Sequence, residues 1–95
     1  PMDCDDLFEW DDRKNSSNEE KHGISFSLAA LIWDGDYIHG KANTVNGEER
    51  FIITGKLDDD FITVVFTMRG ENKRLISARR ARRGERKEYY KYFTE

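Results

Sequence analysis

The sequence predicts an α+β domain in which an antiparallel β-meander sheet is packed by two N-terminal helices and one C-terminal helix. Three observations carry this prediction. Helix-capping residues enclose two segments in the first third of the chain, residues 50–79 alternate with a period of two, and residues 85–93 return to helical spacing. The short connections between the strands favour antiparallel pairing.

The chain has 95 residues, enough for one small domain, which we place at residues 8–95. Residues 1–7 are acidic and are predicted to be a disordered lead-in. The sequence has no apolar run long enough to cross a membrane, and its acidic amino end predicts no signal peptide. Its single cysteine, Cys4, has no partner for an internal disulfide. We therefore expect a cytoplasmic protein.

A short strand and a polar helix are expected first. Residues 8–10 alternate and are rich in aromatic side chains, which predicts a brief strand. Asp11 is a suitable N-cap and Gly23 a suitable left-handed C-cap, so a helix is expected over residues 12–22. One stripe of this helix is polar and consists of Lys14, Asn18, Lys21 and His22. Few of these side chains suit an apolar core, so polar tertiary contacts are predicted.

The next segment is apolar. Ser25 is a good N-cap, and the residues that follow predict a second, core-facing helix over residues 26–33. A loop or a weak edge strand is expected over residues 37–44. The Asn46-Gly47 pair signals a tight turn.

Strands are predicted over residues 50–57, 61–69 and 73–79. The middle strand is β-branched or aromatic almost throughout. Alternation places one set of its side chains against the helices, namely Ile62, Val64, Phe66 and Met68. The opposite set is expected to be polar and open, namely Thr63, Val65, Thr67 and Arg69.

The C-terminal helix is indicated by the spacing of Glu85, Tyr89, Tyr92 and Phe93, of which the last two are expected in the core. Gly84 is unfavourable inside a helix, by about 1 kcal/mol relative to Ala. Either the helix begins at this glycine or the position needs room.

The charge distribution is uneven. Residues 1–48 carry four basic and eleven acidic side chains, a net of −7, whereas residues 49–95 carry twelve basic and eight acidic, a net of +4. Residues 69–91 alone have ten basic and three acidic side chains, a net of +7. Such a stripe attracts phosphates or an acidic protein surface, although a solvated helix face has the same composition.

Two sets of residues resemble a known family. The first set is Phe8-Glu9-Trp10-Asp11, Lys14, Asn18, Lys21-His22-Gly23 and Ser25-Phe26. The second set is Gly47-Glu48-Glu49-Arg50-Phe51-Ile52, Thr54-Gly55, residues 64–70, residues 74–81 and Glu85-Arg86. Together they resemble the BrnT family of toxins from type II toxin–antitoxin systems, over residues 8–90. The chain departs from the family pattern at Ser27-Leu28, where an acidic pair is expected, and at Gly84.

The resemblance implies a compact α+β domain of the RelE-like class. It implies a metal-independent endoribonuclease that arrests translation and needs no cofactor. It also implies a small antitoxin partner with a ribbon-helix-helix DNA-binding region, which neutralises the toxin. Operator DNA is then bound through the antitoxin.

Metal-independent cleavage uses the RNA 2′-hydroxyl as nucleophile and needs cations for the charge that develops on the phosphorus centre. Arginine suits this role because its planar fork holds two phosphate oxygens. Arg69, Arg79 and Arg80 lie at the ends of predicted adjacent strands. Alternation sends Arg79 and Arg80 to opposite faces, so Arg79 is the preferred catalytic cation, with Arg69 beside it.

Cleavage also needs a base for the 2′-hydroxyl and an acid for the leaving 5′-oxygen. The base is expected to be Glu49 or His22. Glu49, close to Arg50 and Arg69, is better suited to orienting a partner, and a structural ion pair is the alternative. His22 or Lys21 is the candidate acid if the first helix reaches the strand ends, whereas a helix-capping role is the alternative for His22.

RNA binding is assigned to the remaining arginines and to an aromatic ring. The predicted backbone-binding residues are Arg80, Arg82, Arg83 and Arg86. On the turn and helix these arginines are equally suited to contact acidic antitoxin residues. Tyr89 or Tyr90 is expected to stack on a base. A module that binds nucleic acid or antitoxin without catalysis is the alternative function, and charge alone does not separate the two.

Overall fold

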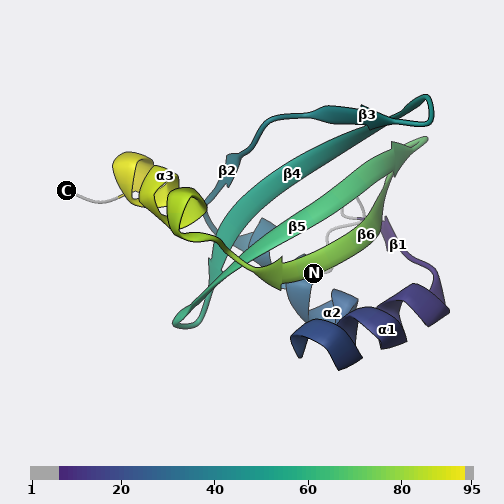
Figure 1. The fold of residues 1–95 in the computed structure, drawn as a ribbon, viewed down its shortest axis with the longest axis horizontal. Coiled ribbons are helices and arrows are strands. Elements are labelled where there is room, and N and C mark those ends of the chain that lie inside the picture. Colours follow the sequence, from purple (N-terminus) through teal and green to yellow (C-terminus); the bar gives the residue numbers. More distant parts are fainter. Residues whose placement is uncertain (1–6, 94–95) are drawn as a thin grey trace.

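Three long antiparallel strands form the centre of the sheet (Figure 1). The computed structural model describes residues 7–93. In chain order the elements are β1 (Phe8–Glu9), α1 (Asp12–His22), α2 (Phe26–Ala29), the 3₁₀ helix η1 (Ala30–Asp34), β2 (Tyr37–His39), β3 (Asn43–Val45), β4 (Glu48–Leu57), β5 (Asp60–Arg69), β6 (Asn72–Arg80) and α3 (Arg83–Phe93). The strands predicted from alternation are β4, β5 and β6.

The strand order is β1-β6-β5-β4-β2, and β3 pairs with another part of β4. The antiparallel β4–β5 and β5–β6 pairings confirm the predicted meander. β1 pairs in parallel with β6, so the sheet is mixed and not purely antiparallel as predicted. A strand of two residues carries too little alternation to reveal its partner. Its position is held in part by an ion pair of 2.8 Å between Glu9 and Arg74.

The segment expected as a loop or weak edge strand contains two short edge strands, β2 and β3. Val45 pairs with Glu48 across the predicted turn. Asn46 and Gly47 both have positive φ angles, 53° and 79°. These angles match the right-handed twist of a two-residue hairpin, which explains the Asn-Gly pair.

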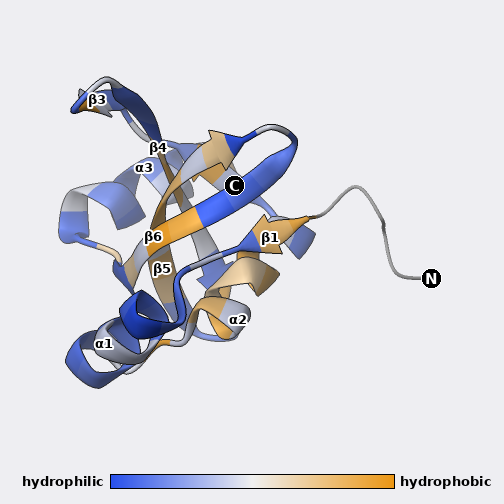
Figure 2. Ribbon diagram, turned by 90° about the vertical axis from the view of Figure 1, so that its right-hand side faces the viewer, coloured by the Kyte–Doolittle hydropathy of each residue, from blue (hydrophilic) through white to orange (hydrophobic). Residues whose placement is uncertain are grey.

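The predicted boundaries of α1 are confirmed. The Asp11 carboxylate accepts hydrogen bonds from the amides of Arg13 and Lys14 at 2.8 and 3.3 Å, and Gly23 ends the helix with φ 74°. α1 is almost entirely hydrophilic, whereas neighbouring α2 is partly apolar (Figure 2). α1 therefore needs specific polar contacts to hold its place.

The predicted second helix is shorter than expected, because the α-helix ends at Ala29 and continues as the 3₁₀ helix η1. The buried side chains Phe26, Ala29 and Ile32 are spaced by three residues. A 3₁₀ helix has three residues per turn, so residues with this spacing lie on the same side of the helix. η1 lies close to the sheet at Gly55, where an added Cβ would be 3.1 Å from the Cβ of Ile32.

The main core lies between the sheet and the α2–η1 segment. It consists of Ile24, Phe26, Ala29, Ile32, Ile53, Ile62, Val64, Phe66, Leu75 and Ala78. The prediction that Ile62, Val64 and Phe66 face the helices is confirmed. Met68 is 43 % exposed, contrary to prediction, because it lies next to the Gly70 hairpin turn and beyond the core.

The opposite face is not as open as predicted. Thr63 and Thr67 are buried. The Thr63 hydroxyl bonds to Thr54 at 2.7 Å and donates to Glu85 of α3 at 2.9 Å, and Thr67 donates to the carbonyl oxygen of Glu49. Each hydroxyl has a partner, which makes its burial inexpensive.

The C-terminal helix packs through a different tyrosine from the one expected. Tyr89, predicted to stack on RNA, is buried against Phe61 with ring centroids 5.1 Å apart, and burial raises its pKa. Tyr92 and Phe93, predicted as core, are 67 % and 38 % exposed. α3 contacts β2 and β4 of the sheet, and Tyr92 and Phe93 lie beside β2 at the surface rather than in the core.

Leu7, assigned to the disordered lead-in, accepts a hydrogen bond from the amide of Lys73 and so continues the β1–β6 pairing. The remainder of the predicted lead-in, residues 1–6, lies outside the described residues. Within residues 7–93, no helix has the length and apolar character needed to span a membrane.

Asn18 attaches α1 to the sheet. Its side-chain amide donates to the carbonyl oxygens of Ala78, at 2.7 Å, and Ile24, at 3.0 Å. Its side-chain oxygen accepts from the amide of Ala78 at 3.1 Å. β1 pairs only with Lys73 and Arg74, at the start of β6. At Ala78, later in the same strand, the Asn18 side chain makes the hydrogen bonds that a neighbouring strand would otherwise make. The predicted polar tertiary contact is confirmed at this residue.

Asn18→Ala is expected to lower the free energy of unfolding by about 3 kcal/mol, because it leaves the buried amide and carbonyl of Ala78 without partners. Urea denaturation measures this loss. Ser16→Ala, on the exposed side of α1, is the control and should change stability by no more than about 0.5 kcal/mol. A loss below about 1 kcal/mol for Asn18→Ala would contradict this account of the helix attachment.

Candidate active site

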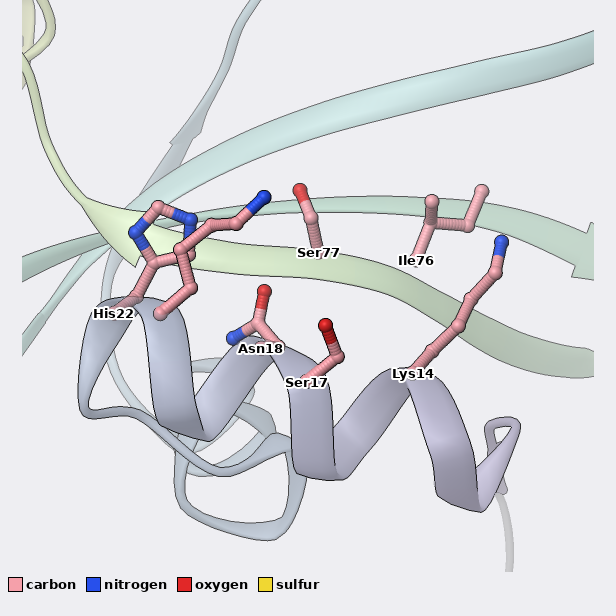
Figure 3. A pocket seen from close by; sticks show the side chains of 7 residues that line it. Lys14, Ser17, Asn18, His22, Ile76 and Ser77 are labelled. Atoms are coloured by element: carbon pink, nitrogen blue, oxygen red, sulfur yellow. The ribbon is translucent and has the colours of Figure 1, made fainter.

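A basic groove lies between α1 and β6 (Figure 3). We call it the α1 groove. It is lined by Lys14, Ser17, Asn18, Lys21, His22, Ile76 and Ser77. None of the described residues that line it is acidic. Two ammonium groups, an imidazole and two hydroxyls therefore share one surface, which favours an anionic ligand.

The order of side chains along this groove follows from how α1 lies on the sheet. The Asn18–Ala78 hydrogen bonds fix the middle of the helix beside β6. In Figure 3, Lys14 lies near Ile76, and His22 lies at the other end of the groove. α1 thus runs alongside β6 in the same direction and brings its C-terminal turn toward the end of that strand.

Arg79 lies two residues beyond Ser77 on β6, so both side chains are on the same face, about 7 Å apart along the strand. The Arg79 guanidinium forms two hydrogen bonds of 2.9 Å with the two carboxylate oxygens of Glu85. The same carboxylate accepts from the Thr63 hydroxyl at 2.9 Å and from the Arg82 amide at 2.7 Å. These contacts attach the start of α3 to the sheet.

The four hydrogen bonds decide the charge state of Glu85. Burial by itself raises the pKa of this carboxyl group. The donors from Arg79, the Arg82 amide and Thr63 outweigh burial and lower the pKa from 4.5 to about 2. Glu85 is therefore a permanent anion near neutral pH and is unsuited to accept a proton. Its position favours an orienting role for the Arg79 guanidinium.

The arrangement as a whole combines an imidazole, two exposed ammonium groups and a guanidinium held by an ion pair. His22 is half-buried, Lys14 and Lys21 are exposed, and the Arg79 side chain is 19 % exposed. Such a set can bind a phosphate and move a proton next to it. Among residues 7–93, no three His, Cys, Asp or Glu side chains are grouped so that they could hold a metal ion.

The sequence profile of the family described as "Ribonuclease toxin, BrnT, of type II toxin-antitoxin system" matches residues 10–85 of the chain. This chain belongs to the BrnT family. Members of the family are ribonuclease toxins, so the protein has RNA as its target and an antitoxin as its partner. Comparison with curated protein sequences finds no match.

The fold is similar to that of a solved structure from the same family, the 1.1 Å crystal structure of the Brucella abortus ribonuclease toxin BrnT. The TM-score is 0.60 and the sequence identity is 23 %. The superposition covers 81 % of this chain and 99 % of the Brucella chain. At this identity the similarity establishes a shared α+β fold, and the site residues must be argued from the present structure.

Three of the predicted catalytic residues of this BrnT-family chain lie along one part of the sheet. Lys21 and His22 line the α1 groove, and Arg79 lies on the same face as Ser77, which forms part of the groove wall. The condition set from the sequence, that the first helix reaches the strand end, is met. The Arg79 fork is already occupied by Glu85, so Arg79 does not present two free donors to a phosphate.

The other two predicted catalytic residues, Arg69 and Glu49, lie at the opposite end of the sheet. Arg79 is opposite Thr63, and Arg69 is six residues further along β5, about 20 Å away for an extended strand. The carbonyl oxygen of Glu49 binds Thr67, near Arg69. The expectation that the strand-end arginines converge was wrong, because antiparallel neighbours place their C-terminal ends at opposite edges.

The predicted RNA-binding arginines have different surroundings. Arg80 is on the face opposite Arg79 and lies 3.6 Å from Asp60. Arg82 and Arg83 are exposed at the start of α3. Arg86 is exposed, and it donates to the carbonyl oxygen of Ala81 at 3.0 Å. Apart from these contacts their charges face solvent, which suits binding to a polyanion.

The sequence predicted Glu85 only as part of the C-terminal helix and gave it no role in the site. A signal for it was present, because a Glu at the third position of a helix commonly accepts a hydrogen bond from the N-cap amide. Here the N-cap is Arg82. Lys14 was also identified only as part of a polar stripe, although its spacing of seven from Lys21 already placed both on one side of α1.

The lowered pKa of Glu85 predicts a pH-dependent stability. Since the folded-state pKa of about 2 is below the unfolded value near 4.5, the carboxylate stabilises the fold fully above pH 4.5. This stabilisation declines between pH 4.5 and 2 and is absent below. Relative to Glu85→Gln, the wild type should be more stable by about 2 kcal/mol at pH 7, allowing for partial exposure.

Chemical denaturation of both proteins from pH 7 to pH 2 measures this difference. The control Glu71→Gln, at the exposed β5–β6 turn, should match the wild type across the range. A Glu85→Gln difference that stays constant down to pH 2 would show that the carboxylate charge does not stabilise the fold.

Proposed function

We propose that this chain is a metal-independent endoribonuclease that cleaves RNA through the 2′-hydroxyl and so arrests translation. The observation that carries the proposal is the α1 groove, in which one imidazole and two ammonium groups lie together and no described lining residue is acidic. This composition supplies, from side chains alone, both proton transfer and the positive charge that the reaction requires. The chemistry agrees with the RelE-like class implied by the sequence resemblance.

In the proposed mechanism His22 accepts the proton of the 2′-hydroxyl, and the 2′-oxygen attacks phosphorus. The bond from phosphorus to the 5′-oxygen breaks, and the Lys21 ammonium donates a proton to that oxygen. The products are a 2′,3′-cyclic phosphate and a 5′-hydroxyl. Lys14 and Arg79 stabilise the negative charge on the phosphorus centre, with Glu85 holding Arg79 in place. This assignment gives Arg69 and Glu49 no role in the chemical step.

The exposed arginines of the α3 region are proposed to bind the RNA backbone or, in the inhibited state, acidic residues of the antitoxin. These are Arg80, Arg82, Arg83 and Arg86. We further propose that the antitoxin is a small ribbon-helix-helix protein that carries the complex to operator DNA, in the cytoplasm. The basic stripe of residues 69–91 supports an acidic partner surface. A neighbouring reading frame without ribbon-helix-helix character would argue against this part of the proposal.

The test is incubation of the purified chain with RNA in the presence of a chelator, followed by analysis of the product ends. Cyclic phosphate and 5′-hydroxyl ends are expected. His22→Gln should lower the cleavage rate about 10²- to 10⁴-fold, because it removes the proton acceptor. Lys21→Met should also lower the rate, through loss of the acid.

Lys41→Met is the matched control, since Lys41 is exposed and outside the α1 groove, and it should cleave as the wild type does. Melting curves identify variants that are merely unfolded. If the wild type binds RNA or antitoxin tightly but leaves RNA intact, the alternative of a non-catalytic binding module is supported. If His22→Gln is folded and fully active, the proposed base is wrong.

A further inference from the structure

A second groove lies between β2, β4 and the first turns of α3, and we call it the α3 groove. It is lined by Ile38, His39, Gly40, Ile52, Thr54, Arg82, Gly84, Glu85 and Glu88. Its volume, about 400 Å³, is in the range of small-molecule sites, roughly 300–1,000 Å³. The proposed chemical step does not use this groove.

The α3 groove lies next to the Arg79–Glu85 ion pair of the candidate active site. Thr54 lines the groove and bonds to Thr63 on β5, and Thr63 is opposite Arg79 on β6. β6 borders the α1 groove and β4 borders the α3 groove. These two strands are separated by β5 and are therefore about 10 Å apart. Glu85 belongs both to the Arg79 ion pair and to the groove wall.

The shape and surface of the α3 groove suit a flat aromatic ring. Two aliphatic side chains, Ile38 and Ile52, contribute apolar walls. Gly40 has no side chain, and an added Cβ there would lie 3.2 Å from the Ile52 side chain. His39 also borders the groove, but it pairs with Ile53 of the core face, and its imidazole packs against the Tyr37 ring with centroids 5.7 Å apart.

Glu88 provides a hydrogen-bond acceptor in this groove. Among residues 7–93, its carboxylate is exposed and has no hydrogen bond or ion pair. Glu85, by contrast, is occupied by Arg79, Thr63 and the Arg82 amide. A free carboxylate accepts hydrogen bonds from amino groups, such as those on the edges of cytosine, adenine and guanine.

Gly84 leaves one wall of the α3 groove bare. A glycine is less favourable than alanine inside a helix, and this one follows the first residue of α3. Its φ angle is not positive, so its backbone conformation does not require glycine. An added Cβ would meet no atom within 4 Å, so packing does not require glycine either. What the missing side chain provides is open space in the groove.

We propose that the α3 groove is a nucleobase subsite that selects a base carrying an exocyclic amino group, next to the scissile phosphate. The inference rests on the proposed function. Glu88 accepts from the amino group, the apolar walls of Ile38 and Ile52 hold the ring, and Gly84 keeps the entrance open. Uracil, which lacks an amino group, is disfavoured.

The experiment compares cleavage of short RNAs that differ in one base at each position around a single cleavage site. For the wild type, one position should show a preference of about fivefold or more for adenine, cytosine or guanine over uracil. Glu88→Gln should reduce that preference to less than about twofold while cleavage continues. Gly84→Leu should lower kcat/KM about tenfold or more, because its side chain fills the groove.

Two controls separate base binding from folding and from charge. Gly84→Ala adds one carbon to open space, so its melting temperature should equal or exceed that of the wild type. Gly84→Leu is informative when its melting temperature is also retained. If that variant unfolds, Ile38→Ala, which shortens an apolar wall of the groove, takes its place. Glu71→Gln removes an exposed carboxylate far from the groove and should leave the base preference unchanged.

Unchanged base preference and unchanged kcat/KM in both Glu88→Gln and Gly84→Leu would overturn the proposal. Weaker antitoxin binding with unchanged cleavage would instead identify the groove as a protein-docking site. Titration with adenosine, cytidine and uridine monophosphates, followed by NMR shifts at His39 and Gly84, separates this inference from the proposed function. If the wild type does not cleave RNA, base-selective shifts still support the subsite, and their absence rejects it.

Discussion

The placement of the candidate active site depends on the pairing of one side-chain amide with the edge of β6. β1 covers only the beginning of that strand, and the backbone of Ala78 beyond it is buried. Asn18 supplies both the donor and the acceptor that a neighbouring strand would supply. Because the rest of α1 is hydrophilic, this pairing rather than apolar burial holds the helix on the sheet. The helix in turn presents Lys14, Lys21 and His22 over β6.

A second polar attachment organises the other helix. The Glu85 carboxylate joins Arg79 of β6, Thr63 of β5 and the first turn of α3. Its lowered pKa keeps the attachment charged at neutral pH. α1 and α3 are thus both fixed to the sheet by hydrogen bonds, and each borders one of the two grooves. The α1 groove carries cations, whereas the α3 groove has apolar walls formed by Ile38 and Ile52.

Local signals accounted for most of the secondary structure. The caps Asp11 and Gly23 define α1, and the two-residue period defines β4, β5 and β6, because each of these depends on neighbours in sequence. The partner of β1 and the burial of Thr63 were not predictable in this way. Both depend on contacts between segments far apart in the chain. The same holds for Tyr89, whose spacing suited either an RNA contact or the core until the position of α3 relative to Phe61 was known.

For the candidate site, residue types and spacing were enough to predict the available chemistry: a histidine and lysines on one helix stripe, and a cluster of arginines from the end of the third long strand onward. They also determined the family resemblance. Which of these groups lie close together depends on the fold. Antiparallel pairing sends Arg69 and Glu49 to one end of the sheet and Arg79 to the other, and the Asn18 pairing brings Lys21 and His22 to the Arg79 end. Proximity across a sheet depends on strand direction and register, which residue types and their spacing do not specify.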